Sequence, residues 1–116
     1  MKTEHFIEQF GGEFISSRSN GTVVAFSKLA DKKHREESGL FLSEGIKMAE
    51  DALLHSQVDA LVFSEDAVKE GREEVLSLAR LGQEKGARLI VAGAPAFDKL
   101  TSEKAPQGVT LQTSTL

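Results

Sequence analysis

The stretch Ala60-Leu61-Val62-Phe63, followed directly by Ser64-Glu65-Asp66, decides the fold class of this 116-residue chain. A run of four apolar residues is too short for a buried helix and fits a strand that is covered on both faces. Ser64 is a favourable residue at a helix start, and the two acids after it complement the helix dipole. The stretch therefore predicts a buried strand that leads straight into a helix.

The same alternation of a short apolar run and a helical segment recurs along the chain. Further strands are predicted at residues 40–42, 89–92 and 109–111. Helical spacing lies between the strands, in residues 46–53, in a long helix from about residue 65 to Gly82 or Gly86, and in a short helix near residues 97–100. Alternating strands and helices are typical of parallel βαβ crossovers. We therefore expect an α/β fold, a three-layer α/β/α sandwich with about four mainly parallel strands.

Two further helical segments are predicted in the N-terminal third. Apolar residues have helix-like spacing up to Gly11-Gly12, which predicts a short helix or arm. Asn20 is a favourable helix cap, and a helix is expected from there to about Arg35. Its apolar stripe consists of Val23, Phe26 and Ala30. A separate basic face carries Lys28, Lys32 and Arg35.

Charge is unevenly distributed along the sequence. The net charge is -4, but residues 18–35 carry five basic residues and one acid, whereas residues 36–116 carry eight basic and fourteen acidic residues. Such clustering can create an anion-attracting surface on an acidic protein. A solvated helix face gives the same pattern, so the two interpretations remain open.

Several classes of site are excluded by composition. The absence of Cys excludes disulfides, a thiolate nucleophile and Cys-ligated metals. The three histidines form no metal-ligating pair, and no nucleotide-binding or hydrolase motif is present, so we expect no metal site. No apolar run approaches the ~20 residues of a membrane span, and the first residues do not read as a secretory signal. We therefore expect a cytoplasmic protein with no membrane partner.

A set of short motifs in a fixed order resembles a known family. The motifs are Ser17-Arg18-Ser19-Asn20, Lys28-Leu29, Lys32-Lys33-His34-Arg35 and Gly39-Leu40-Phe41-Leu42-Ser43-Glu44-Gly45, followed later by Phe97-Asp98-Lys99-Leu100-Thr101 and Pro106-Gln107-Gly108-Val109. Together they resemble the N-terminal substrate-binding domain of the SpoU/TrmH family of RNA 2′-O-ribose methyltransferases. The family patterns are roughly S-x-x-N, K-L, K-x-R, G-x-F-x-x-E-G, F-x-K-L-S and P-Q-G-V. The resemblance covers about residues 14–112.

The resemblance implies a fold, a domain division and a cofactor. The fold is similar to that of ribosomal proteins that bind kink-turn RNA. Residues 1–13 would be an N-terminal extension, residues 14–112 the RNA-substrate-binding domain, and residues 113–116 the start of a linker to a catalytic domain. That domain binds S-adenosylmethionine and needs several asparagines, whereas Asn20 is the only one here. We therefore expect no cofactor in this chain, which is either a piece of a larger enzyme or a stand-alone relative.

The same resemblance implies the partners. These are structured RNA, ribosomal or transfer, and a catalytic methyltransferase domain, and a dimer is expected only with that domain. The predicted RNA-binding residues are Arg18, Asn20, Lys28, Lys32, Lys33 and Arg35. Asn20 has a second interpretation, as a helix cap. Two alternatives remain, a protein-interaction or dimerisation domain without RNA contact, and a small α/β enzyme, against which the lack of a catalytic constellation argues.

Overall fold

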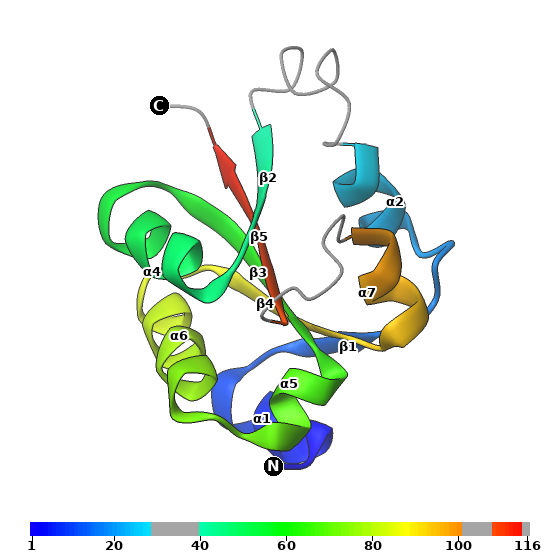
Figure 1. Cartoon of the computed structure of the whole chain (residues 1–116), viewed down its shortest axis with the longest axis horizontal. Helices are drawn as coiled ribbons and strands as arrows, with labels where there is room; N and C mark the ends of the chain where they lie inside the picture. The colour runs from blue at the N-terminus through cyan, green and yellow to red at the C-terminus, as the bar shows by residue number, and fades with distance from the viewer. Residues whose placement is uncertain (29–39, 101–107, 115–116) are drawn as a thin grey trace.

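Five strands form one mixed sheet in the order β1-β4-β3-β5-β2 (Figure 1). The structure is a computed structural model that describes residues 1–28, 40–100 and 108–114. The strands are β1 (Glu13–Ile15), β2 (Leu40–Glu44), β3 (Val58–Ser64), β4 (Arg88–Ala92) and β5 (Val109–Ser114). The helices are α1 (Thr3–Phe10), α2 (Gly21–Ser27), α4 (Ile46–His55), α5 (Glu65–Glu70), α6 (Glu73–Glu84) and α7 (Ala94–Leu100).

Four of the five strands run in the same direction. β1, β4 and β3 are paired in parallel, and β5 is antiparallel to both of its neighbours, β3 and β2. The expected α/β fold with mainly parallel strands is confirmed. The structure differs from the expectation in having β1 as a fifth strand and in the reversed direction of β5.

The start of β5 explains its direction. The carbonyl of Gly108 accepts a hydrogen bond of 2.8 Å from the backbone N–H of Ser64, at the end of β3. β5 therefore begins at the edge of the sheet where β3 ends, and it can only run back along β3. Gly108 has a φ of +82°, a conformation that favours glycine.

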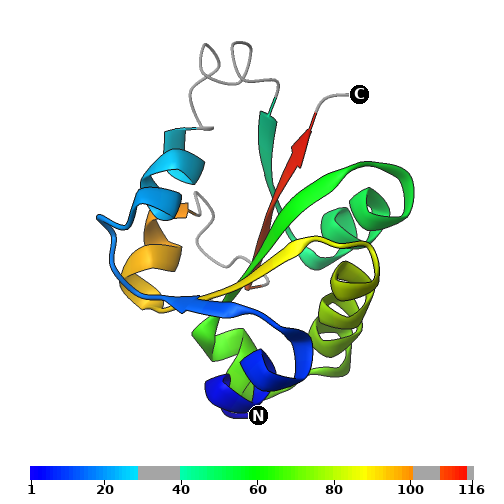
Figure 2. The ribbon, with the colours of Figure 1, turned by 180° about the vertical axis from the view of Figure 1, so that it is seen from behind.

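Helices cover both faces of the sheet and make the sandwich (Figures 1 and 2). Successive strand side chains point to opposite faces. In β3, Leu61 and Phe63 join a core cluster with buried residues of α1, α4, α5 and α6, whereas Ala60 and Val62 join a second cluster with α2 and α7. The two clusters define two helical layers, one on each side of the sheet.

The predicted N-terminal helix is confirmed and contributes to the core. Phe6 is fully buried in α1, and its ring lies 4.9 Å from that of Phe10 and 5.4 Å from that of Phe63, centroid to centroid. Edge-to-face and tilted ring pairs at this distance are favourable. Residues 1–13 therefore hold a helix that packs on the sheet as α4 and α6 do.

The expected long helix after Ser64 is wrong, because the chain forms two helices there. Ser64 caps the first one as predicted, and its Oγ accepts a 3.1 Å hydrogen bond from the N–H of Ala67. α5 ends at Gly71, which has a φ of +63° and donates to the carbonyls of Ala67 and Val68. A left-handed glycine ends a helix, so α6 starts anew after Arg72.

Candidate nucleic-acid interface

The layer made by α2 and α7 holds the described part of the predicted basic site. The loop of residues 16–20 leaves β1, crosses to this layer and starts α2 (Figure 2). α2 packs beside α7 through Val23 and Phe26, against Phe97 and Leu100 of the same cluster. We call the surface of residues 16–28 and 94–100 the α2–α7 face.

Asn20 acts as the helix cap of α2, as one of its two interpretations predicts. Its Oδ1 accepts a 2.8 Å hydrogen bond from the N–H of Thr22. The carbonyl of Asn20 also accepts a bond of 2.9 Å from the N–H of Val24. The residue is half-buried, and both its Oδ1 and its backbone carbonyl oxygen accept hydrogen bonds from α2. An RNA contact by Asn20 stays a prediction.

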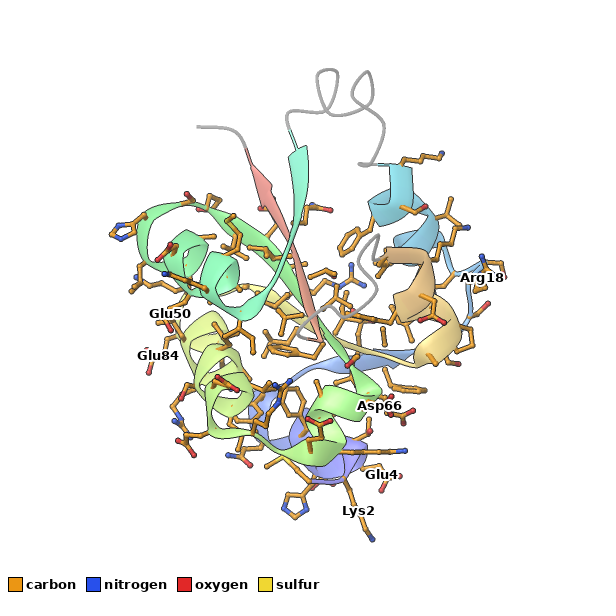
Figure 3. All side chains as sticks on the ribbon, in the orientation of Figure 1. Lys2, Glu4, Arg18, Glu50, Asp66 and Glu84 are labelled. Carbon is orange, nitrogen blue, oxygen red and sulfur yellow. The ribbon has the colours of Figure 1, made fainter. Side chains whose placement is uncertain are left out.

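Arg18 and Lys28 lie exposed at the two ends of α2. Arg18 projects from the loop before the helix, at the edge of the molecule (Figure 3). Lys28 is the C-cap residue of α2, because the helix ends at Ser27. The remainder of the predicted helix, with Lys32, Lys33 and Arg35, lies outside the described residues. The structure therefore places Arg18, Asn20 and Lys28 on one face and leaves the other three predicted residues as predictions.

Two cations on this side of the sheet were not predicted as site residues. Lys99 of α7 donates a hydrogen bond of 3.3 Å to the backbone carbonyl of Arg18. Arg88 of β4 donates from Nη2 to the hydroxyl of Thr22 in α2, at 3.4 Å, and pairs with Glu13 of β1. Lys99 stands inside one of the family-like motifs, but only the packing of α7 beside α2 shows that it meets the loop.

Charge divides sharply between the two helical layers. The helices α1, α4, α5 and α6 carry ten acidic and three basic side chains, and we call them the acidic layer. Among its acids, Glu4, Glu50, Asp66 and Glu84 are labelled in Figure 3, away from Arg18. The α2–α7 face, counted with its loop and with Lys28, carries one acid, Asp98, and three basic residues, Arg18, Lys28 and Lys99, whereas α2 and α7 themselves carry only Asp98 and Lys99. An anionic polymer is therefore repelled by one layer and attracted by the other.

Neither of two hollows on the protein adjoins the α2–α7 face. One of about 300 Å³ lies at the end of α4 and is lined by residues 53–58 and Lys85, and the other, of about 590 Å³, is lined by residues 1–4, Glu65 and Lys69. Across residues 1–28, 40–100 and 108–114, no three His, Asp or Glu side chains converge as a metal site would require. In the same part of the chain, no helix has the length and apolarity needed to cross a membrane.

A comparison with models of known protein families shows to which family the chain belongs. The model of the MRM3-like substrate-binding domain matches residues 20–110, which is most of the chain. The chain belongs to this family. The match includes α2, α7, β2, β3, β4 and the first two residues of β5, and it leaves out β1 and residues 111–114. No curated protein is significantly similar to this MRM3-like domain.

Solved structures agree with the family. An rRNA methyltransferase from Sinorhizobium meliloti matches with a TM-score of 0.73 at 25% identity, over 89% of this chain and 37% of that one. An RNA 2′-O ribose methyltransferase matches with a TM-score of 0.69 at 20% identity, over 89% and 38%. The SpoU methyltransferase AviRb from Streptomyces viridochromogenes matches with a TM-score of 0.62 at 17% identity, over 84% and 34%. The resemblance to the SpoU/TrmH enzymes is confirmed, and the MRM3-like domain spans little more than a third of their length.

Two of these relatives are also known with a bound cofactor. Structures of the Sinorhizobium enzyme and of AviRb contain AdoMet. In the MRM3-like domain, the hollow at the end of α4 is lined mainly by uncharged residues, and the other hollow is lined by residues 1–4, Glu65 and Lys69. Nothing in the described residues shows cofactor binding, and we assign no AdoMet site to them.

Proposed function

We propose that this domain binds the RNA substrate of a SpoU/TrmH-type 2′-O-ribose methyltransferase and that its α2–α7 face contacts the RNA. The observation that carries the proposal is the division of charge between the two helical layers. The overall charge of -4 would repel RNA, so binding requires that the cations face one way. Family membership supports RNA as the ligand.

The chemistry of the face favours contact with the RNA backbone. Arg18 and Lys28 are exposed and can neutralise phosphates, and between them the outward residues Gly21 and Ala25 are small. Small side chains let a sugar–phosphate backbone approach the helix closely. Trp and Tyr are absent from the chain, which argues against a platform on which bases stack. We therefore propose recognition of the shape of a folded RNA.

In this proposal a separate catalytic domain binds AdoMet and transfers its methyl group. The residues of this chain hold the RNA in place and take no part in the chemical step. We favour ribosomal RNA as the substrate, since the relative at 25% identity is described as an rRNA methyltransferase. Transfer RNA is the alternative that the experiment below distinguishes.

The test is a binding titration with charge reversals on both layers. The chain would be titrated with a folded ribosomal RNA fragment, a transfer RNA and a DNA duplex of the same length, at two salt concentrations. Arg18→Glu with Lys28→Glu is the test pair, and Lys47→Glu with Arg80→Glu on the acidic layer is the control with the same change in net charge. We expect the test pair to weaken RNA binding about tenfold or more and to flatten its salt dependence, with a much smaller effect of the control.

The outcomes separate the proposal from its alternatives. Equal weakening by both pairs would show that only net charge matters, and would overturn the assignment of the α2–α7 face. No RNA binding at low salt would overturn the RNA-binding function. Sedimentation of the chain alone would then show whether it associates with itself, as a dimerisation domain would.

A further inference from the structure

We infer that Arg18, Lys99 and the hydroxyls of Ser17 and Ser19 form a binding site for one phosphate group of the RNA backbone. The inference rests on the proposed function for the identity of its ligand, because an RNA phosphate and free inorganic phosphate share the same chemistry. The site lies where the loop of residues 16–20 meets the last turn of α7.

Lys99 is held beside the loop by the fold. Its Nζ donates to the carbonyl of Arg18 at 3.3 Å, across 81 positions of sequence. The side chain is half-buried, and its neighbours in α7, Phe97 and Leu100, are 5% and 3% exposed in the core. An ammonium group has three donors, so two remain for a ligand. The ammonium therefore lies at the backbone of Arg18, with donors left for a ligand.

The loop itself turns two hydroxyls toward each other on either side of Arg18. The Oγ atoms of Ser17 and Ser19 are 2.9 Å apart, and the N–H of Ser19 donates to Ser17 Oγ at 3.2 Å. The two hydroxyls carry two protons, and the bond between them uses one. One hydroxyl proton is left to donate to an anion. All three side chains of residues 17–19 are exposed.

The two cations of the site lack an acidic partner in the part of the chain that the structure describes. The ion pairs found there belong to Arg72 and Arg88, not to Arg18 or Lys99. The acid nearest in sequence is Asp98, which is exposed. Two cations held close together repel each other, and an anion between them removes that repulsion. A phosphate fits, because the guanidinium can bind two of its oxygens while the ammonium contacts a third.

The test compares Lys99→Gln with a matched loss of one charge elsewhere. Lys47→Gln on the acidic layer is the control, and Lys99→Arg retains the charge. The slope of log affinity against log salt would be measured for RNA with each variant. We expect Lys99→Gln to reduce the slope by about 0.7 to 0.9, the value of one phosphate contact, and the other two variants to leave it unchanged.

A second arm uses inorganic phosphate and needs no RNA. Phosphate would be titrated into the isotope-labelled chain while its backbone amides are followed by NMR. We expect saturable shifts at residues 17–19 and 99 in the native sequence, and their loss in Lys99→Gln and in Ser17→Ala with Ser19→Ala. The amide spectrum also shows directly whether each variant is folded.

The two arms distinguish failure of the site from failure of the function. Suppose that the native chain binds RNA and that the Lys99→Gln and Lys47→Gln variants show the same slope of log affinity against log salt. The phosphate site is then overturned, while the proposed function stands. If RNA does not bind but phosphate shifts residues 17–19, the function is overturned and the anion site stands. If neither ligand binds, both are overturned.

Discussion

Arg88 and Glu13 form an ion pair, with Nε and Oε1 2.5 Å apart, although 75 positions separate them in the chain. The pair joins β4 to the edge strand β1, and the same guanidinium reaches Thr22 in α2. Three elements therefore meet at one side chain, at the start of the α2–α7 face. Both partners are nearly half exposed, 48% and 45%, so water and salt weaken their attraction.

We expect this ion pair to contribute little to stability. In a double-mutant cycle with Glu13→Gln and Arg88→Gln, the coupling free energy of unfolding should be below about 1 kcal/mol, the usual range for exposed pairs. It should shrink further in 1 M salt, because salt screens the attraction between exposed charges. Urea denaturation of the four proteins at both salt concentrations measures it. A coupling of several kcal/mol that salt does not change would contradict the prediction.

Gly108 is expected to tolerate no side chain. A Cβ there would lie 2.6 Å from Cβ of Ala67 and 3.0 Å from Oγ of Ser64, and φ is +82°. Gly108→Ala should cost about 2 to 4 kcal/mol of unfolding free energy, from backbone strain and overpacking together.

Gly86→Ala is the matched control for this substitution. Gly86 has a φ of +79°, but a Cβ at this position would have no atom within 4 Å, so an alanine there would be strained in its backbone without a steric clash. Its replacement should cost only about 1 to 2 kcal/mol. Equal losses for the two variants, measured by chemical denaturation, would show that Ala67 and Ser64 move aside easily.

Replacement of Asn20 should separate its two interpretations. Asn20→Ala removes the acceptor for Thr22 and should cost about 1 kcal/mol of unfolding free energy. Asn20→Ser keeps an acceptor at the cap and should restore most of that loss. If Asn20 is only a cap, Asn20→Ser also binds RNA as the native chain does. Weakened RNA binding by a fully stable Asn20→Ser variant would instead establish a contact.

We expect the substitution Thr110→Val to stabilise the domain. The residue is fully buried in β5, opposite Val62, and its Oγ1 has no hydrogen-bond partner among the described residues. An unsatisfied buried hydroxyl costs about 1 to 3 kcal/mol, and valine has nearly the same shape. Thr110→Val should therefore raise the free energy of unfolding, and Thr110→Ala, which leaves a gap, should lower it. A loss of stability in Thr110→Val would show that the hydroxyl is bonded.

The central strands could be predicted because their signal is local. β3 and β4 are runs of buried apolar residues that no solvated helix would contain. β1 escaped prediction because only Ile15 of its three residues is buried, which leaves no pattern to detect. The direction of β5 was equally hidden, since a short apolar run looks the same in either direction. It depends on where Gly108 meets Ser64, a contact across 44 positions.

Only part of the candidate site, likewise, could be predicted from the sequence. Arg18 and Lys28 were singled out by the clustering of positive charge, and Asn20 was singled out as a helix cap, both of which are local signals. Lys99 enters the site only through the packing of α7 against α2, which periodicity does not reveal. The break at Gly71 was missed because Val68 and Val75 keep a helical spacing across it, although two helices supply them.

The position of β5 in the sheet also governs when the domain can be completed during synthesis. In the part of the chain that the structure describes, the edge strand β2 pairs with β5 and with no other strand, and β5 is the last strand to be translated. A nascent chain on the ribosome thus exposes residues 40–44 without a strand partner until residues 109–114 have emerged from the exit tunnel. During that interval the unpaired edges of β2 and β3 can associate with other chains. Closure of this edge of the sheet therefore waits for β5, whatever the order in which the helices pack.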